Sequence, residues 1–357
     1  MELTRRKTTT VTVGKVKIGS GHPVVVQSMT CTDTHDIRGT LRQIRQLTVA
    51  GCELVRVAVP DREAVPALKE FVRNSPVPII ADIHFDYRLA LEGMKAGAAG
   101  IRINPGNIGG KEKISRIIDM ARDKGVCIRL GVNAGSLEKD LPEGAQRKGQ
   151  AEAMVASALR HIAFFEKKAF TNLKISLKSS DVLQSIRAYQ LLAEKVDYPF
   201  HLGITEAGTL LSGTVKSALG IGLLLFQGIG DTLRVSLTAD PREEIKVAYE
   251  ILRALGLRRR GVEIVSCPTC GRCQVNLFPL VRKVEKAVQA YSQPLKVAIM
   301  GCVVNGPGEA READVGIAGG KGLGLLFAKG KQLRKVDEKD LLSSLLGEIE
   351  KTIQEKK

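Results

Sequence analysis

Four of the seven cysteines fall near the C-terminal end of the sequence, at spacings that suit metal ligands. Cys267, Cys270 and Cys273 follow one another at every third position, and Cys302 lies further downstream. Such thiolates, with a donor from a distant loop, bind either a structural zinc ion or an iron-sulfur cluster, and the spacing leaves both open. Glycines at positions 301, 306 and 308 give the backbone N–H groups near Cys302 room to face sulfide ions, which favours the cluster.

A second set of residues suited to chemistry is basic and lies within or just after short apolar runs. Burying an arginine or lysine side chain in such a run costs free energy unless the side chain contacts an anion. Internal salt bridges to Asp82, Glu206 and Asp231 are one explanation, but the cations, which include Lys174, outnumber these acids two to one. We therefore expect a positive site for a phosphate or diphosphate. The expected binding residues are Arg56, Arg102, Arg129, Asn133, Lys178, Arg234 and Ser236.

Eight short β-branched runs must position these side chains. Helix-like segments separate the runs, which is typical of βα units, and eight parallel strands close a (β/α)8 TIM-type barrel. In such barrels the chemistry lies at the C-terminal ends of the strands, where the polar residues collect in this sequence. Residues 1–20 alternate Thr or Lys with Val and predict a hairpin that closes the barrel floor. The runs lie at 24–26, 54–57, 78–80, 100–103, 126–130, 173–177, 200–203 and 232–235.

A basic linker at 258–260 leads into a second, smaller α/β unit. Apolar patterning there predicts strands near 262–265, 296–299 and 314–318, a helix near 277–290 and a closing helix from about residue 337. We therefore assign residues 1–258 to the barrel, which binds the substrate, and 259–357 to a domain that carries the four cysteines.

The formal net charge of +16 is compatible with nucleic-acid binding, because Lys and Arg neutralise phosphates of any sequence. Nine Phe, five Tyr and no Trp leave few platforms for base stacking, so we expect no nucleic-acid partner. No apolar stretch reaches the about 20 residues that cross a bilayer. No apolar core follows the N-terminal charges either, as it would in a secretory signal. We expect a cytoplasmic protein with reduced cysteines and no membrane partner.

Several motifs, in order along the chain, resemble the 4-hydroxy-3-methylbut-2-enyl diphosphate synthase family. The most specific are Ser-Cys-Pro-Thr-Cys-Gly-Arg at 266–272 and Met-Gly-Cys-Val-Val-Asn-Gly-Pro-Gly-Glu at 300–309. The segments 25–30, 102–107, 129–136 and 201–208 also match the family pattern. The resemblance covers nearly the whole chain and is to the short bacterial form of the family.

This resemblance implies a [4Fe-4S] cluster with three cysteine ligands and one glutamate, which are Cys267, Cys270, Cys302 and Glu309 in this sequence. Cys273 is then not a ligand, despite its spacing. The implied reaction reductively opens and dehydrates 2-C-methyl-D-erythritol 2,4-cyclodiphosphate to the allylic diphosphate of non-mevalonate isoprenoid biosynthesis. Flavodoxin or ferredoxin is the implied source of its two electrons. The family also implies a homodimer whose active site is shared between subunits.

Two carboxylates complete the hypothesis. Glu206 follows a strand end among the cations and is the expected proton donor, and Asp82 is expected to hold a substrate hydroxyl. The main alternative is a phosphate-binding barrel enzyme with a structural zinc, held by all four C-terminal cysteines. Glu309 separates the two, because the zinc protein would not need it.

Overall fold

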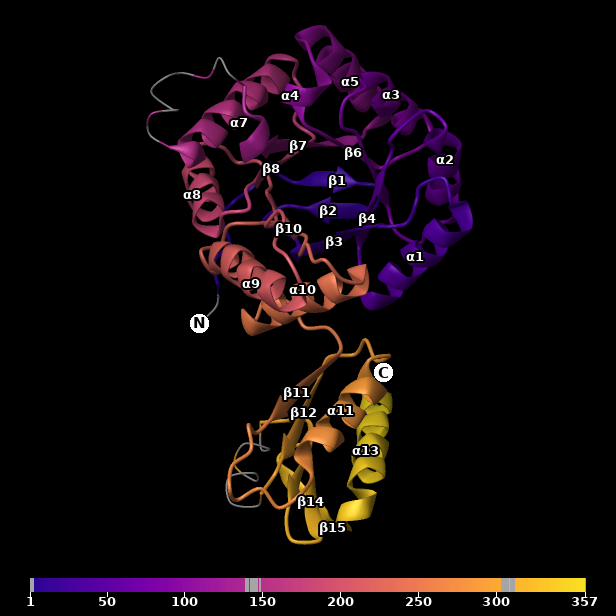
Figure 1. Cartoon of the computed structure of the whole chain (residues 1–357), viewed down its shortest axis with the longest axis vertical. Helices are drawn as coiled ribbons and strands as arrows, with labels where there is room; N and C mark the ends of the chain where they lie inside the picture. The colour runs from indigo at the N-terminus through magenta and orange to yellow at the C-terminus, as the bar shows by residue number, and fades with distance from the viewer. Residues whose placement is uncertain are drawn as a thin grey trace. The chain divides into compact units, whose positions relative to one another are not determined.

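The structure is a computed structural model that describes residues 3–138, 141, 147, 149–302, 308 and 312–356. The chain folds into two compact units, Met1–Arg258 and Arg259–Lys357, which Figure 1 shows from indigo to yellow along the chain. Within the described ranges, no helix combines the length and the apolar character needed to span a membrane.

The first unit is a barrel of parallel strands enclosed by helices, which confirms the predicted fold class (Figure 1). The strands are hydrogen-bonded in the order β8-β7-β6-β5-β4-β3-β10-β9. A parallel bridge between Ile175 and Phe200 connects the two ends of this order. The strands are β3 (Val25–Met29), β4 (Leu54–Ala58), β5 (Ile79–Asp82), β6 (Gly100–Ile103), β7 (Cys127–Asn133), β8 (Leu173–Lys178), β9 (His201–Leu202) and β10 (Thr232–Leu233).

Amphipathic helices cover the outside of the barrel and share one apolar core with the strands. In the first of them, Asp36 caps the N-terminus by accepting a hydrogen bond from the N–H of Gly39. Gly51 ends the same helix at φ 111°, a conformation that glycine adopts readily. The helices are α1 (Ile37–Ala50), α2 (Ala64–Asn74), α3 (Tyr87–Lys95), α4 (Pro105–Ile108), α5 (Lys111–Lys124), α7 (Gln150–Lys167), α8 (Val182–Ala193), α9 (Leu210–Phe226) and α10 (Pro241–Ala254), with a 3-10 turn at Ala134–Ser136.

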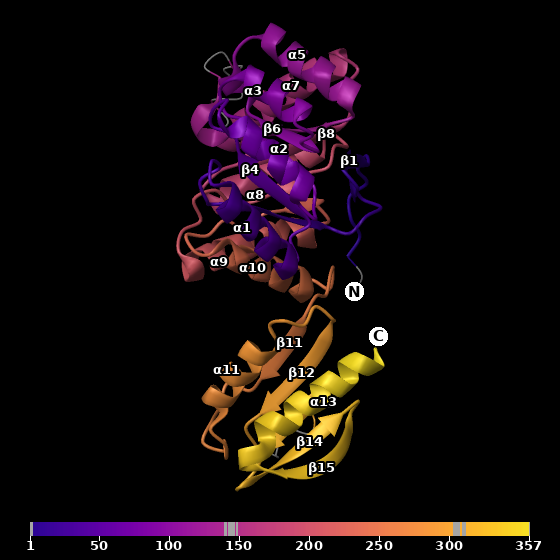
Figure 2. The ribbon, with the colours of Figure 1, turned by 90° about the vertical axis from the view of Figure 1, so that its right-hand side faces the viewer.

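The predicted N-terminal hairpin is present and closes the floor of the barrel. Strands β1 (Val11–Val13) and β2 (Val16–Ile18) pair antiparallel, and β1 lies at one end of the barrel in Figure 2. Their buried side chains pack against Val25, Leu54 and Ile80, which come from three neighbouring barrel strands. The floor is therefore apolar, and polar side chains can fill the barrel only above it.

The second unit contains one mixed sheet in the order β11-β12-β13-β14-β15. The three predicted strands correspond to β11 (Val262–Ser266), β12 (Leu295–Met300) and β13 (Val315–Gly319), which pair in parallel. The predicted helices correspond to α11 (Leu277–Val288) and α13 (Leu341–Glu355), which follows a 3-10 turn at Glu338–Asp340. Both helices contribute buried residues to one apolar core with the sheet.

The sequence analysis missed the antiparallel hairpin of β14 (Leu323–Ala328) and β15 (Lys331–Asp337). The edge strand β15 is exposed at every position except Val336, and it carries Lys331, Arg334 and Lys335. Charged residues on an edge strand prevent pairing with other chains. They also remove the apolar alternation by which a strand is recognised in a sequence.

Candidate functional site

A pocket opens at the C-terminal ends of the barrel strands β4, β8, β9 and β10. Side chains in a strand alternate between the two faces of a sheet, so every second residue of these strands points into the barrel. Four of the predicted binding residues, Arg56, Lys178, Arg234 and Ser236, line this pocket. The other lining residues are His201, Gly203, Ile204 and Thr205.

A row of cations fills the barrel interior on neighbouring strands. Arg102 of β6 pairs in register with Arg129 of β7, and Arg129 pairs with Lys174 of β8. These side chains are at most 2% exposed. Gly131 leaves room for this row, because a Cβ atom there would lie 3.1 Å from Nε of Arg102. The backbone register thus brings three positive charges together away from water.

Arg129 and Lys174 differ from ordinary buried cations because the described residues offer them no hydrogen-bond partner. Within the described part of the chain, no hydrogen-bond partner is found for the three guanidinium nitrogens of Arg129 or for Nζ of Lys174. A buried cation without a partner is strongly unfavourable, so proteins keep such groups where a ligand supplies the missing charge. This interior is therefore suited to an anion.

Asp82 is the acidic partner for part of this row. Its carboxylate lies 3.5 Å from Nε of Arg56, 3.3 Å from Nη1 of Arg102 and 3.5 Å from Nε2 of His84. Burial alone would raise the pKa of Asp82. The nearby Arg56, the hydrogen bond from His84 and the charges of Arg102 and Arg129 outweigh that effect and hold the pKa below its usual range. Asp82 is consequently a carboxylate that accepts hydrogen bonds.

Burial and the crowding of positive charge lower the pKa values of two of these cations. Burial, with the repulsion of Arg234 and Arg102, lowers the pKa of Arg56 to about 10. Burial also lowers the pKa of Lys174 to about 8, and Arg129 and Arg56 add to that shift. An anion bound among these groups would remove much of this repulsion. The same groups therefore have the properties of an anion-binding site.

His201 is a pocket residue whose environment keeps it neutral. Its imidazole is 3% exposed, and Nδ1 lies 2.7 Å from the hydroxyl oxygen of Thr232. Burial and the surrounding cations, Arg129 first among them, lower its pKa well below the ordinary value. The histidine thus adds a polar but uncharged group to a positive pocket.

The remaining predicted residues of the barrel occupy different surroundings. Asn133 ends β7, and its Oδ1 has no hydrogen-bond partner within the described residues. Glu206 is exposed and follows the pocket residue Thr205, with φ at 54° in the left-handed region. A strained backbone at a non-glycine residue is frequent in functional sites. Asp231, one of the three acids weighed against the cations, precedes β10 and binds Arg5, 2.5 Å away, far from the strand ends at the mouth.

The sequence analysis missed Glu244, the acid that pairs with Arg234. Its Oε1 lies 3.1 Å from Nη2 of Arg234, and its side chain is 3% exposed. Glu244 comes from the first turn of helix α10, not from a strand end, so it was not counted among the acids of the mouth. The signal available in the sequence was an acidic pair, Glu243 and Glu244, at the start of the helix that follows Arg234.

In the second unit, the parallel pairing of β11 and β12 brings the cysteine segments together. Ser266 lies opposite Ile299, so the chain leaves the two strands at the same edge with Cys267 on one and Gly301 on the other. The N–H of Gly301 donates to Sγ of Cys267 at 3.3 Å. A Cβ atom at Gly301 would lie 2.5 Å from Sγ of Cys273, so only glycine leaves space for the thiols there.

The two remaining cysteines lie near a common cation, Arg272. Hydrogen bonds from Arg272 lower the pKa of Cys270, backbone first and side chain second. The side-chain hydrogen bond with Cys270, followed by the charges of Cys270 and Cys302, in turn raises the pKa of Arg272. Among the described residues, no three His, Cys, Asp or Glu side chains surround one point closely enough for a single metal ion. Glu309 lies outside the described residues.

Comparisons with known proteins match both units of the chain. Residues 8–249 match the family model of the GcpE TIM-barrel domain, and residues 263–351 match that of the GcpE protein C-terminal domain. A protein of Geobacter sulfurreducens named 4-hydroxy-3-methylbut-2-en-1-yl diphosphate synthase (flavodoxin) is 56% identical over 354 residues, 99% of each chain. A protein of the same name from Maridesulfovibrio salexigens is 57% identical over 357 residues, again 99% of each chain.

Among solved structures, dihydropteroate synthase from Stenotrophomonas maltophilia aligns with a TM-score of 0.51 and 17% identity. The alignment covers 69% of this chain and 98% of that chain. At this identity the match shows a shared barrel fold and carries no information on the reaction.

Proposed function

The chain belongs to the GcpE family of 4-hydroxy-3-methylbut-2-en-1-yl diphosphate synthases, and from this premise we propose that it converts 2-C-methyl-D-erythritol 2,4-cyclodiphosphate to 4-hydroxy-3-methylbut-2-enyl diphosphate. The enzyme is an oxidoreductase of non-mevalonate isoprenoid biosynthesis. The reaction takes two electrons from an external donor, breaks a carbon-oxygen bond to the cyclic diphosphate and removes a hydroxyl as water.

The observation that carries this proposal is the unpartnered, buried Arg129 in a row of cations below the pocket. The row and the pocket residues together form a positive interior that attracts anions. We assign the diphosphate to Arg56, Arg102, Arg129, Asn133, Lys178, Arg234 and Ser236. In this assignment the apolar floor below the row excludes water and strengthens the attraction between charges.

We assign a [4Fe-4S] cluster to Cys267, Cys270, Cys302 and Glu309. Cys267 accepts a hydrogen bond from the N–H of Gly301, and Cys270 and Cys302 lie near Arg272. These positive surroundings suit thiolates that bind an anionic group. When bound, such a group would supply single electrons and an iron atom with an exchangeable ligand. Glutamate suits the position whose ligand is exchanged most easily, because a carboxylate oxygen binds iron more weakly than a thiolate does.

The zinc alternative receives less support. It needs Cys267, Cys270, Cys273 and Cys302 around a single ion. All four residues are described, and no three of them surround one point. A cluster spreads its ligands over several irons, so its cysteines need not converge in this way. Cys273 stays outside the ligand set because the family resemblance implies Cys267, Cys270 and Cys302 as the cysteine ligands.

Two carboxylates of the barrel have separate roles in the proposed reaction. Asp82, held as a carboxylate by Arg56 and Arg102, accepts a hydrogen bond from a substrate hydroxyl. Glu206 donates the proton that the leaving hydroxyl needs to depart as water. Its place next to the pocket residue Thr205 and its left-handed backbone support this role.

We propose that flavodoxin, or a ferredoxin, supplies the electrons. The first of these donors appears in the names of the relatives. We also propose a cytoplasmic homodimer, whose reduced thiols suit the cluster. Helix α9 supports a protein contact, because one of its faces exposes large apolar side chains. These side chains are Leu211, Val215, Leu219, Leu223 and Phe226.

Anaerobic purification of the full chain tests this function. Iron and sulfide analysis should give about four irons per chain, and an assay with reduced donor should consume the cyclodiphosphate. Sedimentation of the same sample should give the mass of two chains. Zinc without iron, after reconstitution with iron and sulfide has also failed, would overturn the redox assignment in favour of the zinc alternative.

A further inference from the structure

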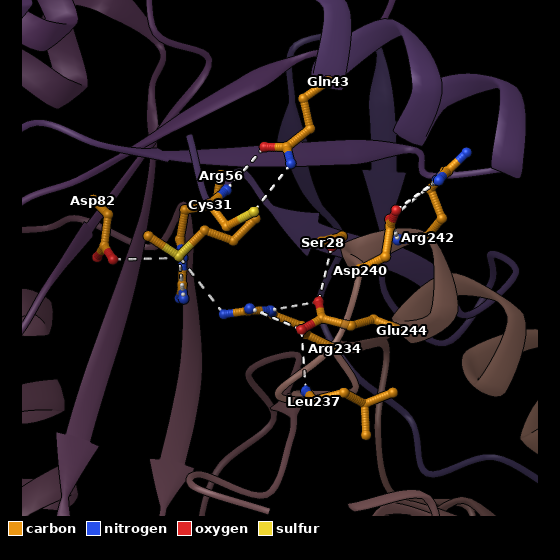
Figure 3. Close-up of polar contacts among 11 residues, drawn as sticks. Ser28, Cys31, Gln43, Arg56, Asp82, Arg234, Leu237, Asp240, Arg242 and Glu244 are labelled. Carbon is orange, nitrogen blue, oxygen red and sulfur yellow. Dashed lines mark hydrogen bonds and ion pairs between the residues drawn. The ribbon is translucent and has the colours of Figure 1, made fainter. Parts of the chain in front are cut away.

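Two arginines of the pocket, Arg56 and Arg234, approach the same sulfur atom (Figure 3). Sδ of Met29 lies 3.2 Å from Nε and 3.0 Å from Nη2 of Arg56. It also lies 3.6 Å from Nη1 of Arg234. The thioether has no charge, so it separates the two cations without neutralising them. The guanidinium of Arg234 therefore needs another group to fix its orientation.

Glu244 provides that group and uses both of its oxygens. Oε1 accepts from Nη2 of Arg234 at 3.1 Å and from the backbone N–H of Leu237 at 3.2 Å. Oε2 accepts from Nε of Arg234 at 3.2 Å and from the hydroxyl of Ser28 at 2.9 Å. Figure 3 shows this carboxylate between Ser28, Arg234 and Leu237. The contact with Arg234 is the planar, two-point geometry that fixes a guanidinium most firmly.

The arrangement leaves one side of Arg234 available to a ligand. Nε and Nη2 are occupied by Glu244, whereas Nη1 lies 3.6 Å from Sδ of Met29. Both arginines line the pocket. The side chain of Glu244 is 3% exposed, and that of Arg234 is 20% exposed, so the acid lies behind the cation. Helix α10 further favours a negative charge, because Glu244 lies in its first turn.

We propose that Glu244 is a positioning residue, which holds Arg234 in the orientation that binds the diphosphate. This inference rests on the proposed function and adds a residue to it. Ser28 and the N–H of Leu237 fix the carboxylate in turn, so strand β3, helix α10 and the segment after β10 act together on one guanidinium.

A purely electrostatic role for Glu244 predicts the opposite effect on binding. Loss of a negative charge near an anion site strengthens anion binding when charge alone matters. Loss of a positioning group weakens it, because the arginine then samples orientations that do not meet the ligand. The sign of the change in affinity therefore separates the two roles.

The test measures the dissociation constant of the full, iron-loaded chain for the cyclodiphosphate by calorimetry, without reductant, so that no turnover occurs. Glu244→Gln should bind about tenfold more weakly than the unchanged protein. With reduced donor, its KM should rise while kcat changes less. Ser28→Ala, which removes one hydrogen bond but no charge, should show a smaller change in the same direction.

Glu243→Gln is the matched control, because Glu243 lies on the same helical turn but binds Lys246 instead of a pocket residue. It makes the same charge change and should leave the dissociation constant within about twofold of the unchanged protein, since exposed charges are well screened. Unchanged iron content and melting temperature show that each variant is folded.

The outcomes distinguish this proposal from the function itself. If the unchanged protein fails to bind the cyclodiphosphate, the proposed function is wrong. If the unchanged protein binds it and Glu244→Gln binds equally well or more tightly, only the positioning role is overturned. Should Glu244→Gln fail to fold, Ser28→Ala decides, and binding equal to that of the unchanged protein then counts against the proposal.

Discussion

The barrel mouth and the cysteine segments are built in contrasting ways. In the barrel, Arg56, Arg102 and Arg129 are at most 4% exposed and lie on strands whose register fixes their spacing. In the second unit, Cys270 is exposed and follows Thr269, whose φ is 68°. Regular strands thus hold the positive site, whereas turns after strand ends hold the thiols.

This contrast indicates that the two sites depend differently on their ligands. The backbone forms the cationic row before any anion binds, at the cost of repulsion between its members. The cysteine turns offer flexible donors, which a cluster would bring into final position. Mutations in the barrel should therefore change anion binding without changing the iron content, and mutations of the cysteines should do the reverse.

The largest effect is expected at Cys302. Cys302→Ser should lose most of the bound iron and all measurable turnover, because serine is a poor substitute for a thiolate ligand. Cys273→Ser is the matched control and should keep the iron. Binding of inorganic diphosphate should be unchanged in both variants, as calorimetry can show. Equal loss of iron from the two variants would contradict the ligand assignment.

The barrel fold and part of its positive site could be predicted from the sequence. Eight β-branched runs, five of which carry a cation, predicted the barrel and four of the residues that line the pocket, because a parallel barrel places the ends of its strands together. The pairing of Arg234 with Glu244 could not be predicted in this way. It depends on how helix α10 packs on the barrel, and one side of a helix cannot be matched to one strand from periodicity alone.

In the second unit, too, one element could not be predicted from the sequence, for a different reason. The strands β11, β12 and β13 are apolar and could be predicted, whereas β15 is an exposed, charged edge strand. Its pairing with β14 is set by backbone hydrogen bonds and a bulge between Leu326 and Phe327. Neither feature leaves a clear pattern in the sequence.

A second large effect is expected at Glu206, which belongs to the barrel but acts on the reaction rather than on binding. Glu206→Gln should lower turnover by about 100-fold or more, since the amide cannot donate the proton. Its iron content and its affinity for the cyclodiphosphate should equal those of the unchanged protein. Steady-state assays and calorimetry on the same samples measure both. Near-normal turnover would refute the role of proton donor.

A smaller effect, with opposite signs for binding and stability, is expected at Arg129. Arg129→Met should weaken diphosphate binding by about 10- to 100-fold, because a buried charge that meets the ligand is lost. It should also raise the melting temperature of the ligand-free protein, since the unpartnered guanidinium no longer has to be buried. Arg88→Met, which removes an exposed arginine paired with Asp86, should change neither quantity much. A lower melting temperature for Arg129→Met would show that the row is compensated within the protein.

The smallest effect is expected on the pH dependence of folding stability, to which Lys174 contributes. Burial, together with Arg129 and Arg56, lowers its pKa to about 8 from the ordinary 10.5. Between these values the unfolded chain holds a proton that the folded chain has lost, so this group makes stability rise with pH across that window. Lys174→Met should reduce this rise in stability, which denaturant unfolding at several pH values measures.

A bound anion should restore the proton on Lys174. Diphosphate binding near pH 8.5 should therefore take up protons in the unchanged protein and fewer protons in the variant. Equal proton uptake in the two proteins would place Lys174 outside the field of the ligand and confine the anion to the arginines.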